Sequence, residues 1–71
     1  MAFEDLLREE KRQQVFELLK WNEKYNNSGK NHIFAVAKDL GMKPHEAETL
    51  LEGLRKNGKL FRSNAFYYIN Q

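Results

Sequence analysis

The chain of 71 residues contains no cysteine and only one proline. Without cysteine it can form neither a disulfide framework nor a thiolate metal site, which is typical of proteins in reducing compartments. No apolar run approaches the ~20 residues that a helix needs to cross a bilayer. The N-terminal residues also lack the basic region and apolar core of a signal peptide. These absences predict an intracellular protein, in the cytoplasm, nucleoid or nucleus, with no membrane partner.

Acidic residues are missing from the C-terminal end of the chain. The net charge is only +2, but residues 53–71 hold four basic side chains and no acid. This net charge is too small to indicate a nucleic-acid partner, but the basic residues are concentrated at one end of the chain. We therefore expect any anionic partner to meet this end.

Motifs for catalysis and for cofactor binding are missing as well. His32 and His45 are the only histidines, and their spacing does not place two metal ligands on one helix face. The acids are scattered, the serines have no base nearby in the sequence, and no glycine-rich phosphate loop is present. The sequence predicts a protein that is not an enzyme and has no metal or cofactor.

The clearest helical pattern begins at Pro44. Proline suits the first position of a helix, because its missing N–H is not needed there and its φ angle is already helical. Gly58 is expected to end the helix in the left-handed conformation. Gly53 lies inside this helix, where glycine lowers helix stability by ~1 kcal/mol relative to alanine. Its presence indicates a close approach by another backbone, by DNA or by the preceding helix. The apolar stripe of this helix consists of Ala47, Leu50, Leu51 and Leu54.

Two further helices precede Pro44. The second has an apolar stripe and ends at Gly41, so that a tight turn containing Met42 joins it to the helix at Pro44. Residues 26–30 form a loop after the first helix, and a short edge strand at residues 30–31 is one option there. The first stripe consists of Val15, Leu18, Leu19 and Tyr25, flanked by Phe16 and Trp21, and the second of Ile33, Val36, Ala37 and Leu40.

The C-terminal end has the pattern of a β-hairpin. Residues 60–62 and 66–69 are aromatic and β-branched, and residues 63–65 have turn chemistry. Alternation places Tyr67 on the face opposite to Phe66 and Tyr68. We interpret Phe61, Phe66 and Tyr68 as core residues and expect Tyr67 at the surface.

The order helix, helix, tight turn, helix, strand, strand is that of a winged helix-turn-helix. The fold class is therefore predicted to be α+β and mainly α, with three helices and a short C-terminal hairpin as the wing. Residues 14–71 form the domain. Residues 1–13 are a polar helical lead or an extension of the first helix.

Several stretches also resemble a known family. They look like winged helix-turn-helix domains in general, and like the C-terminal winged-helix domain of archaeal-type minichromosome maintenance (MCM) replicative helicases in particular. The wing lacks the glycine and proline of many such helicases, and residues 1–13 match no pattern of the family. The resemblance implies an accessory domain that binds DNA weakly or modulates the motor, with the ATPase elsewhere in a longer protein. The stretches are Phe34–Met42, Glu46–Glu48, Leu50–Leu51, Leu54–Phe61 and Phe66–Ile69.

A DNA-binding interpretation gives a definite set of contacts. The helix at Pro44 would enter the major groove and the wing would follow the backbone. Glu46 and Glu52 would then face a polyanion, which predicts sequence-independent binding in the range of ~10⁻⁴–10⁻⁶ M. A solvated basic surface near the carbonyl end of the helix is the alternative. The expected DNA contacts are Lys43, His45, Thr49, Arg55, Lys56, Lys59 and Arg62.

Two other functions stay open. A winged helix that binds other domains or subunits of a replication complex would use exposed apolar side chains. A small transcription regulator would dimerise through residues 3–14, whereas the isolated domain is expected to be a monomer. The candidate protein contacts are Phe3, Leu6, Leu7, Trp21 and Tyr67.

Overall fold

The computed structural model describes the backbone of residues 3–70 and the side chains of residues 8–70. The protein contains three α-helices and one antiparallel two-stranded hairpin. The predicted α+β, mainly helical class is confirmed, and the layout is consistent with a winged helix. The elements are α1 (Phe3–Lys24), the 3₁₀ helix η1 (Ser28–Asn31), α2 (Ile33–Leu40), α3 (Pro44–Lys56), β1 (Leu60–Ser63) and β2 (Phe66–Ile69).

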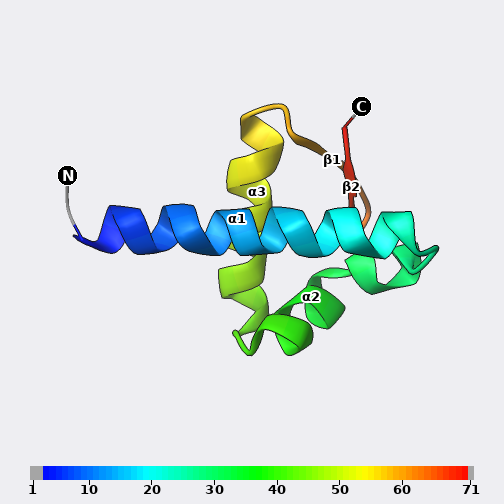
Figure 1. Ribbon diagram of the computed structural model, residues 1–71, viewed down its shortest axis with the longest axis horizontal. Helices are drawn as coiled ribbons and strands as arrows, with labels where there is room; N and C mark the ends of the chain where they lie inside the picture. The colour runs from blue at the N-terminus through cyan, green and yellow to red at the C-terminus, as the bar shows by residue number, and fades with distance from the viewer. Residues whose placement is uncertain (1–2, 71) are drawn as a thin grey trace.

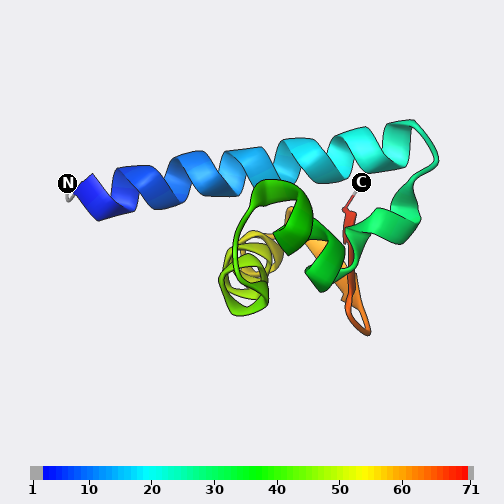
Figure 2. The same cartoon turned by 90° about the horizontal axis from the view of Figure 1, so that it is seen from below.

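Helix α1 is the longest element, and the other elements lie on one side of it (Figure 2). It crosses α3 steeply, and its N-terminal turns extend beyond the rest of the molecule (Figure 1). The polar run at residues 8–14 is thus an extension of the first helix, one of the two predicted alternatives.

The core lies where α1, α2, α3 and the inner face of the hairpin meet. The three predicted apolar stripes supply most of it, and Phe16, Leu18, Leu40 and Met42 pack around it half-buried. Tyr25 is an exception, because α1 ends at Lys24 and leaves the Tyr25 side chain 51% exposed. The buried apolar residues are Val15, Leu19, Ile33, Val36, Ala37, Ala47, Leu50, Leu51, Leu54, Leu60 and Tyr67.

Glycine ends both α2 and α3, as predicted. Gly41 and Gly58 have φ angles of 66° and 79°. After α3, the Gly58 N–H donates to the Arg55 carbonyl and the Lys59 N–H to the Leu54 carbonyl, both at 3.0 Å. This pattern satisfies carbonyls that the last helical turn leaves without a partner.

The predicted edge strand at residues 30–31 is wrong. These residues belong to η1, where Asn31 is fully buried. The Asn22 amide donates to the Asn31 side-chain oxygen at 3.0 Å, and this buried pair ties η1 to α1. The extended residue is His32, which forms an isolated antiparallel bridge with Phe66.

The hairpin has the predicted strands, except that β1 continues to Ser63, which was predicted in the turn. The prediction assigned the two faces of the hairpin the wrong way round. Tyr67 is fully buried, so it does not lie at the surface. Phe61 is 48% exposed, and Phe66 and Tyr68 are half-buried on the outer face. Alternation shows which residues share a face and not which face meets the helices. Leu60, buried on the same face as Tyr67, marks the inner face.

Within the protein, the close approach at Gly53 comes neither from another backbone nor from the preceding helix α2, and the predicted approach by DNA stays a prediction. A Cβ atom at this position would lie 3.2 Å from Nε of Arg12. The Arg12 side chain of α1 therefore occupies the space that Gly53 leaves open on α3. Among the described residues, no helix is long and apolar enough to span a membrane.

Candidate nucleic-acid-binding surface

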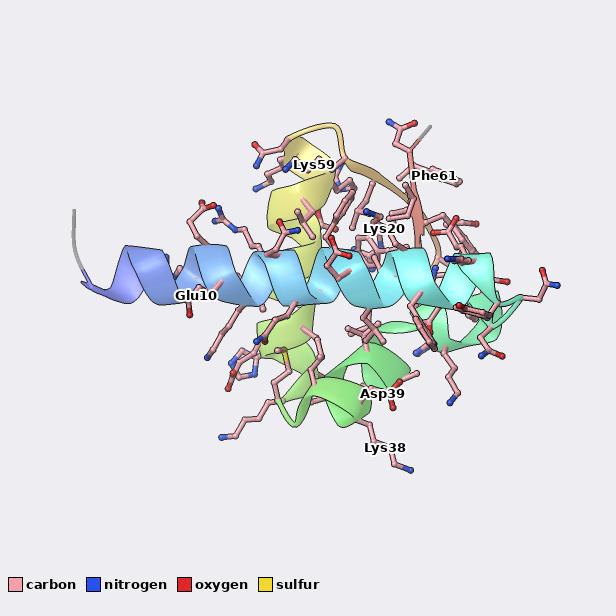
Figure 3. All side chains as sticks on the ribbon, viewed as in Figure 1. Glu10, Lys20, Lys38, Asp39, Lys59 and Phe61 are labelled. Carbon is pink, nitrogen blue, oxygen red and sulfur yellow. The ribbon has the colours of Figure 1, made fainter. Side chains whose placement is uncertain are left out.

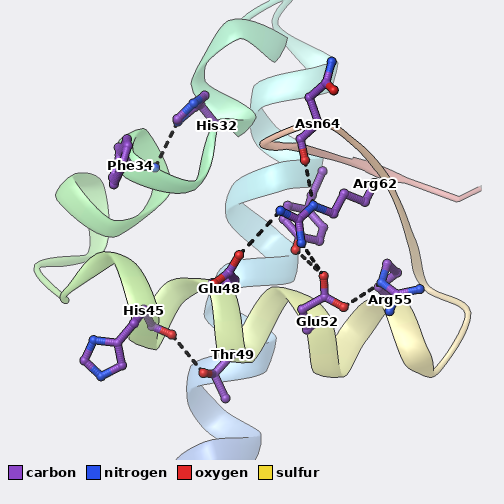
Figure 4. A network of polar contacts seen from close by, with 10 residues as sticks. His32, Phe34, His45, Glu48, Thr49, Glu52, Arg55, Arg62 and Asn64 are labelled. Atoms are coloured by element: carbon purple, nitrogen blue, oxygen red, sulfur yellow. Dashed lines mark hydrogen bonds and ion pairs between the residues drawn. The ribbon is translucent and has the colours of Figure 1, made fainter.

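A polar network joins the exposed side of α3 to the hairpin (Figure 4). The Glu52 carboxylate accepts hydrogen bonds from the Tyr67 hydroxyl at 2.6 Å and from Arg62 Nη1 at 2.8 Å. Its other oxygen accepts from Arg55 Nε at 2.7 Å. Arg62 also lies 3.5 Å from a Glu48 oxygen and donates from Nε to the Asn64 carbonyl at 2.6 Å.

These partners stabilise the ionised form of Glu52. The hydrogen bond from Tyr67, with those from Arg55 and Arg62, lowers the pKa of Glu52 to about 2 despite partial burial. Burial and the bond to Glu52 raise the pKa of Tyr67. The tyrosine therefore stays a neutral donor and the glutamate a charged acceptor.

The network neutralises two of the predicted phosphate contacts. Arg55 and Arg62 both form ion pairs with Glu52, and Arg62 also pairs with Glu48. Residues 53–71 contain no acid, but α3 brings two carboxylates to the basic hairpin. Charge counting along the sequence could not show this pairing, because the two partners of Arg62 are ten or more positions away.

The other predicted DNA contacts lie around α3. Lys43 is the N-cap residue, and His45 and Thr49 are exposed one turn apart, with the Thr49 hydroxyl donating to the His45 carbonyl at 2.8 Å. Lys56 is exposed at the last position of the helix. The Lys59 Nζ lies over the Phe16 ring, 5.7 Å from its centroid.

A groove between α1 and α3 adds basic residues that the sequence analysis did not single out. Its volume is about 250 Å³, and α1 contributes three basic side chains to it. Arg12 pairs with Glu9 at 3.1 Å, and its buried Nε has no hydrogen-bond partner among the described residues. Only the crossing of α1 over α3 brings these side chains to His45. The groove is lined by Arg8, Lys11, Arg12, His45, Glu46, Thr49 and Leu50.

The predicted protein contacts are spread over separate places. Trp21 is 58% exposed and packs against Tyr25, with ring centroids 4.3 Å apart. A second groove, of about 600 Å³, runs between this part of α1 and the end of β2. Tyr67 is buried and takes no part. The side chains of Phe3, Leu6 and Leu7 lie outside the described part of the chain.

The chain matches no protein-family model, and comparisons with curated proteins and with solved structures found no significant similarity. Within residues 8–70, no group of three or more histidine, cysteine or acidic side chains could hold a metal ion.

Proposed function

We propose that this protein is a winged-helix module that binds the phosphate backbone of DNA weakly and without sequence preference. One observation carries the proposal: the groove in which Arg8, Lys11 and Arg12 of α1 meet His45 and Thr49 of α3. Helix α3 is the element that enters the major groove in helix-turn-helix proteins, and basic side chains beside it can contact the flanking phosphates.

The polar groups on α3 favour weak binding. Glu46 lies in the same groove as the basic side chains, and Glu48 and Glu52 offset Arg55 and Arg62. A few phosphate contacts then supply the affinity, with an expected Kd of ~10⁻⁴–10⁻⁶ M at physiological salt.

The groove also changes which residues we expect to contact DNA. Lys43, His45, Thr49 and Lys56 remain candidates on α3, and Arg8 and Lys11 join them, whereas Arg55 and Arg62 act mainly within the protein. The role as an accessory domain of a replication protein rests on the sequence resemblance to MCM helicases.

The test is fluorescence anisotropy with a labelled DNA duplex at several salt concentrations. The variant Arg8→Gln/Lys11→Gln removes two positive charges from the groove. The matched control, Lys20→Gln/Lys24→Gln, removes two charges from exposed positions further along the same helix. We expect the groove variant to bind less tightly and to reduce the slope of log Kd against log salt by ~0.9 for each lost phosphate contact.

The control should bind the duplex as tightly as the unchanged protein. Equal weakening in both variants would show that binding follows total charge and not the groove. No duplex binding by the unchanged protein at low salt would refute the proposed function.

A second candidate function, protein binding, is favoured by the exposed Trp21–Tyr25 pair beside the larger groove. Tryptophan and tyrosine are enriched at the energetic centres of protein interfaces. Trp21→Ala should abolish this function and leave duplex binding unchanged, which pull-down from a replication extract and anisotropy would compare.

A further inference from the structure

The outer face of the hairpin carries a continuous row of aromatic rings. Along the row, the ring centroids of Phe34 and His32 are 5.3 Å apart, and those of His32 and Phe66 are 5.1 Å apart. Phe66 then stacks on Tyr68 at 6.3 Å, and Tyr68 lies 5.3 Å from Phe61. The bridge between His32 and Phe66 joins the start of α2 to β2, so that two distant segments form one surface.

This aromatic row lies outside the core. The inner face of the hairpin already packs on the helices through Leu60 and Tyr67. At the two ends of the row, Phe34 is 64% and Phe61 is 48% exposed, and Figure 3 shows Phe61 beside the strands at the edge of the molecule. Contiguous apolar side chains that are exposed in this way are typical of binding surfaces.

Charge identifies the class of partner. Residues 24–38, which supply Phe34 and His32, contain three lysines and no acid, and the exposed Asp39 follows them. In residues 53–71, Arg55 and Arg62 pair with carboxylates of α3, so that Lys56 and Lys59 are the exposed cations outside that network. Lys38 is exposed one helical turn after Phe34, and Lys59 is exposed just before β1, where its Nζ lies over the Phe16 ring of α1. Aromatic rings flanked by positive charge match a partner with flat apolar groups on a negative backbone, and a nucleic acid has both.

The spacing of the rings distinguishes a single strand from a duplex. Neighbouring centroids are 5.1–6.3 Å apart. Paired bases rise only ~3.4 Å per step and have their faces covered by their neighbours. Bases reach successive rings only when they are unstacked, which a single strand allows.

We propose that the aromatic row of Phe34, His32, Phe66, Tyr68 and Phe61 binds single-stranded nucleic acid by stacking on its bases, with Lys38 beside it for a phosphate contact. This surface is separate from the groove between α1 and α3. The inference therefore goes beyond the proposed duplex binding and does not rest on it.

The first test compares two fluorescein-labelled strands of ~12 nucleotides, a length that one small binding domain can cover. One is oligothymidylate, and the other has the same phosphates with every base removed. Stacking predicts that the strand without bases binds at least about 25-fold more weakly, since each of the two most exposed rings contributes about fivefold. This comparison needs no variant protein.

The second test uses Phe34→Ala and Phe61→Ala, which truncate the two most exposed rings of the row. Each should weaken oligothymidylate binding about fivefold. Phe61→Tyr should restore it, because the ring is kept. Trp21→Ala removes an equally exposed aromatic ring elsewhere and should bind like the unchanged protein. Circular dichroism verifies that each variant is folded.

Equal affinity for the two strands overturns the proposal, and so does undiminished oligothymidylate binding by both alanine variants. Analytical ultracentrifugation tests the alternative that the aromatic row is a protein interface. In that case neither strand binds, the unchanged chain self-associates, and replacing Phe34 and Phe61 makes it monomeric. Duplex binding separates the two proposals, because Arg8→Gln/Lys11→Gln should impair it and the Phe34 and Phe61 variants should not.

Discussion

Glu52 has a different role in the structure from the one that its position in the sequence indicates. It lies on the helix side away from the apolar stripe, where a solvated acid is expected. In the structure it accepts hydrogen bonds from Tyr67, Arg62 and Arg55 at the junction of α3 and the hairpin. Helical periodicity predicted the side of α3 correctly, but not that a strand would cover part of it.

The first prediction concerns the buried hydroxyl of Tyr67. Tyr67→Phe removes the donor of the 2.6 Å bond to Glu52 and leaves the ring in place. We expect the free energy of unfolding to fall by about 1.5–3 kcal/mol, the range for a hydrogen bond to a charged group. Urea denaturation measures the change. The matched control is Tyr68→Phe on the outer face, and an equally large effect there would contradict the prediction.

The second prediction is a pH dependence of stability. Because the pKa of Glu52 is lowered from its ordinary 4.5 to about 2, folding favours the ionised form. Its contribution is therefore complete above its ordinary pKa and is lost as pH falls through the folded pKa. The unchanged protein should exceed Glu52→Gln in stability at neutral pH, and the difference should shrink between about pH 4.5 and about pH 2. Urea denaturation across this range measures it; a difference independent of pH would refute the assignment.

At the scale of elements, local signals in the sequence predicted the three helices well. Pro44 begins α3, and Gly41 and Gly58 end α2 and α3, since these positions depend on the conformational limits of single residues. The failures lie where an element depends on a distant partner. Residues 30–31 form η1 because Asn31 pairs with Asn22, a contact that propensity does not encode.

The third prediction tests the glycine that ends α3. Gly58→Ala places a side chain at a φ of 79°, and no atom lies within 4 Å of the new Cβ, so the cost is purely conformational. We expect a loss of ~1–2 kcal/mol in the free energy of unfolding. Gly29→Ala is the matched control, because it also has open space but no positive φ, and it should change stability little. Chemical denaturation measures both variants: a loss only in Gly58→Ala indicates a backbone effect, and equal losses in both would contradict it.

At the scale of the whole molecule, one buried and two partly buried polar contacts connect the last turns of α1 to η1 and to β2. Glu23 of α1 accepts the Ile69 N–H of β2 at 2.7 Å and lies 3.5 Å from the Asn31 amide nitrogen. Asn31 in turn accepts from Asn22. These four residues join α1, η1 and β2, and nothing in their types or spacing marks them as partners.

The fourth prediction uses this connection. Asn31→Ala leaves the buried Asn22 amide nitrogen without its acceptor, and Asn22→Ala leaves the Asn31 side-chain oxygen without its donor. Each should cost about 1–3 kcal/mol in the free energy of unfolding. The double variant should lose clearly less than the total of the two, because neither amide is then left alone. A cycle of urea denaturation curves measures this coupling, and strictly additive losses would show that the pair does not act together.

Helix periods, glycine stops and strand alternation follow from local geometry, so the residues themselves dictated the element order, the apolar stripes and the fold class. The arrangement of surfaces depended on contacts between distant segments. The crossing of α1 and α3 brings Arg8 and Lys11 to His45, and the packing of Leu60 turns Phe61 outward. The pairing of Arg62 with Glu48 and Glu52 neutralises a basic end that charge counting leaves positive. These surfaces depend on which faces meet in space, and the tertiary structure alone decides that.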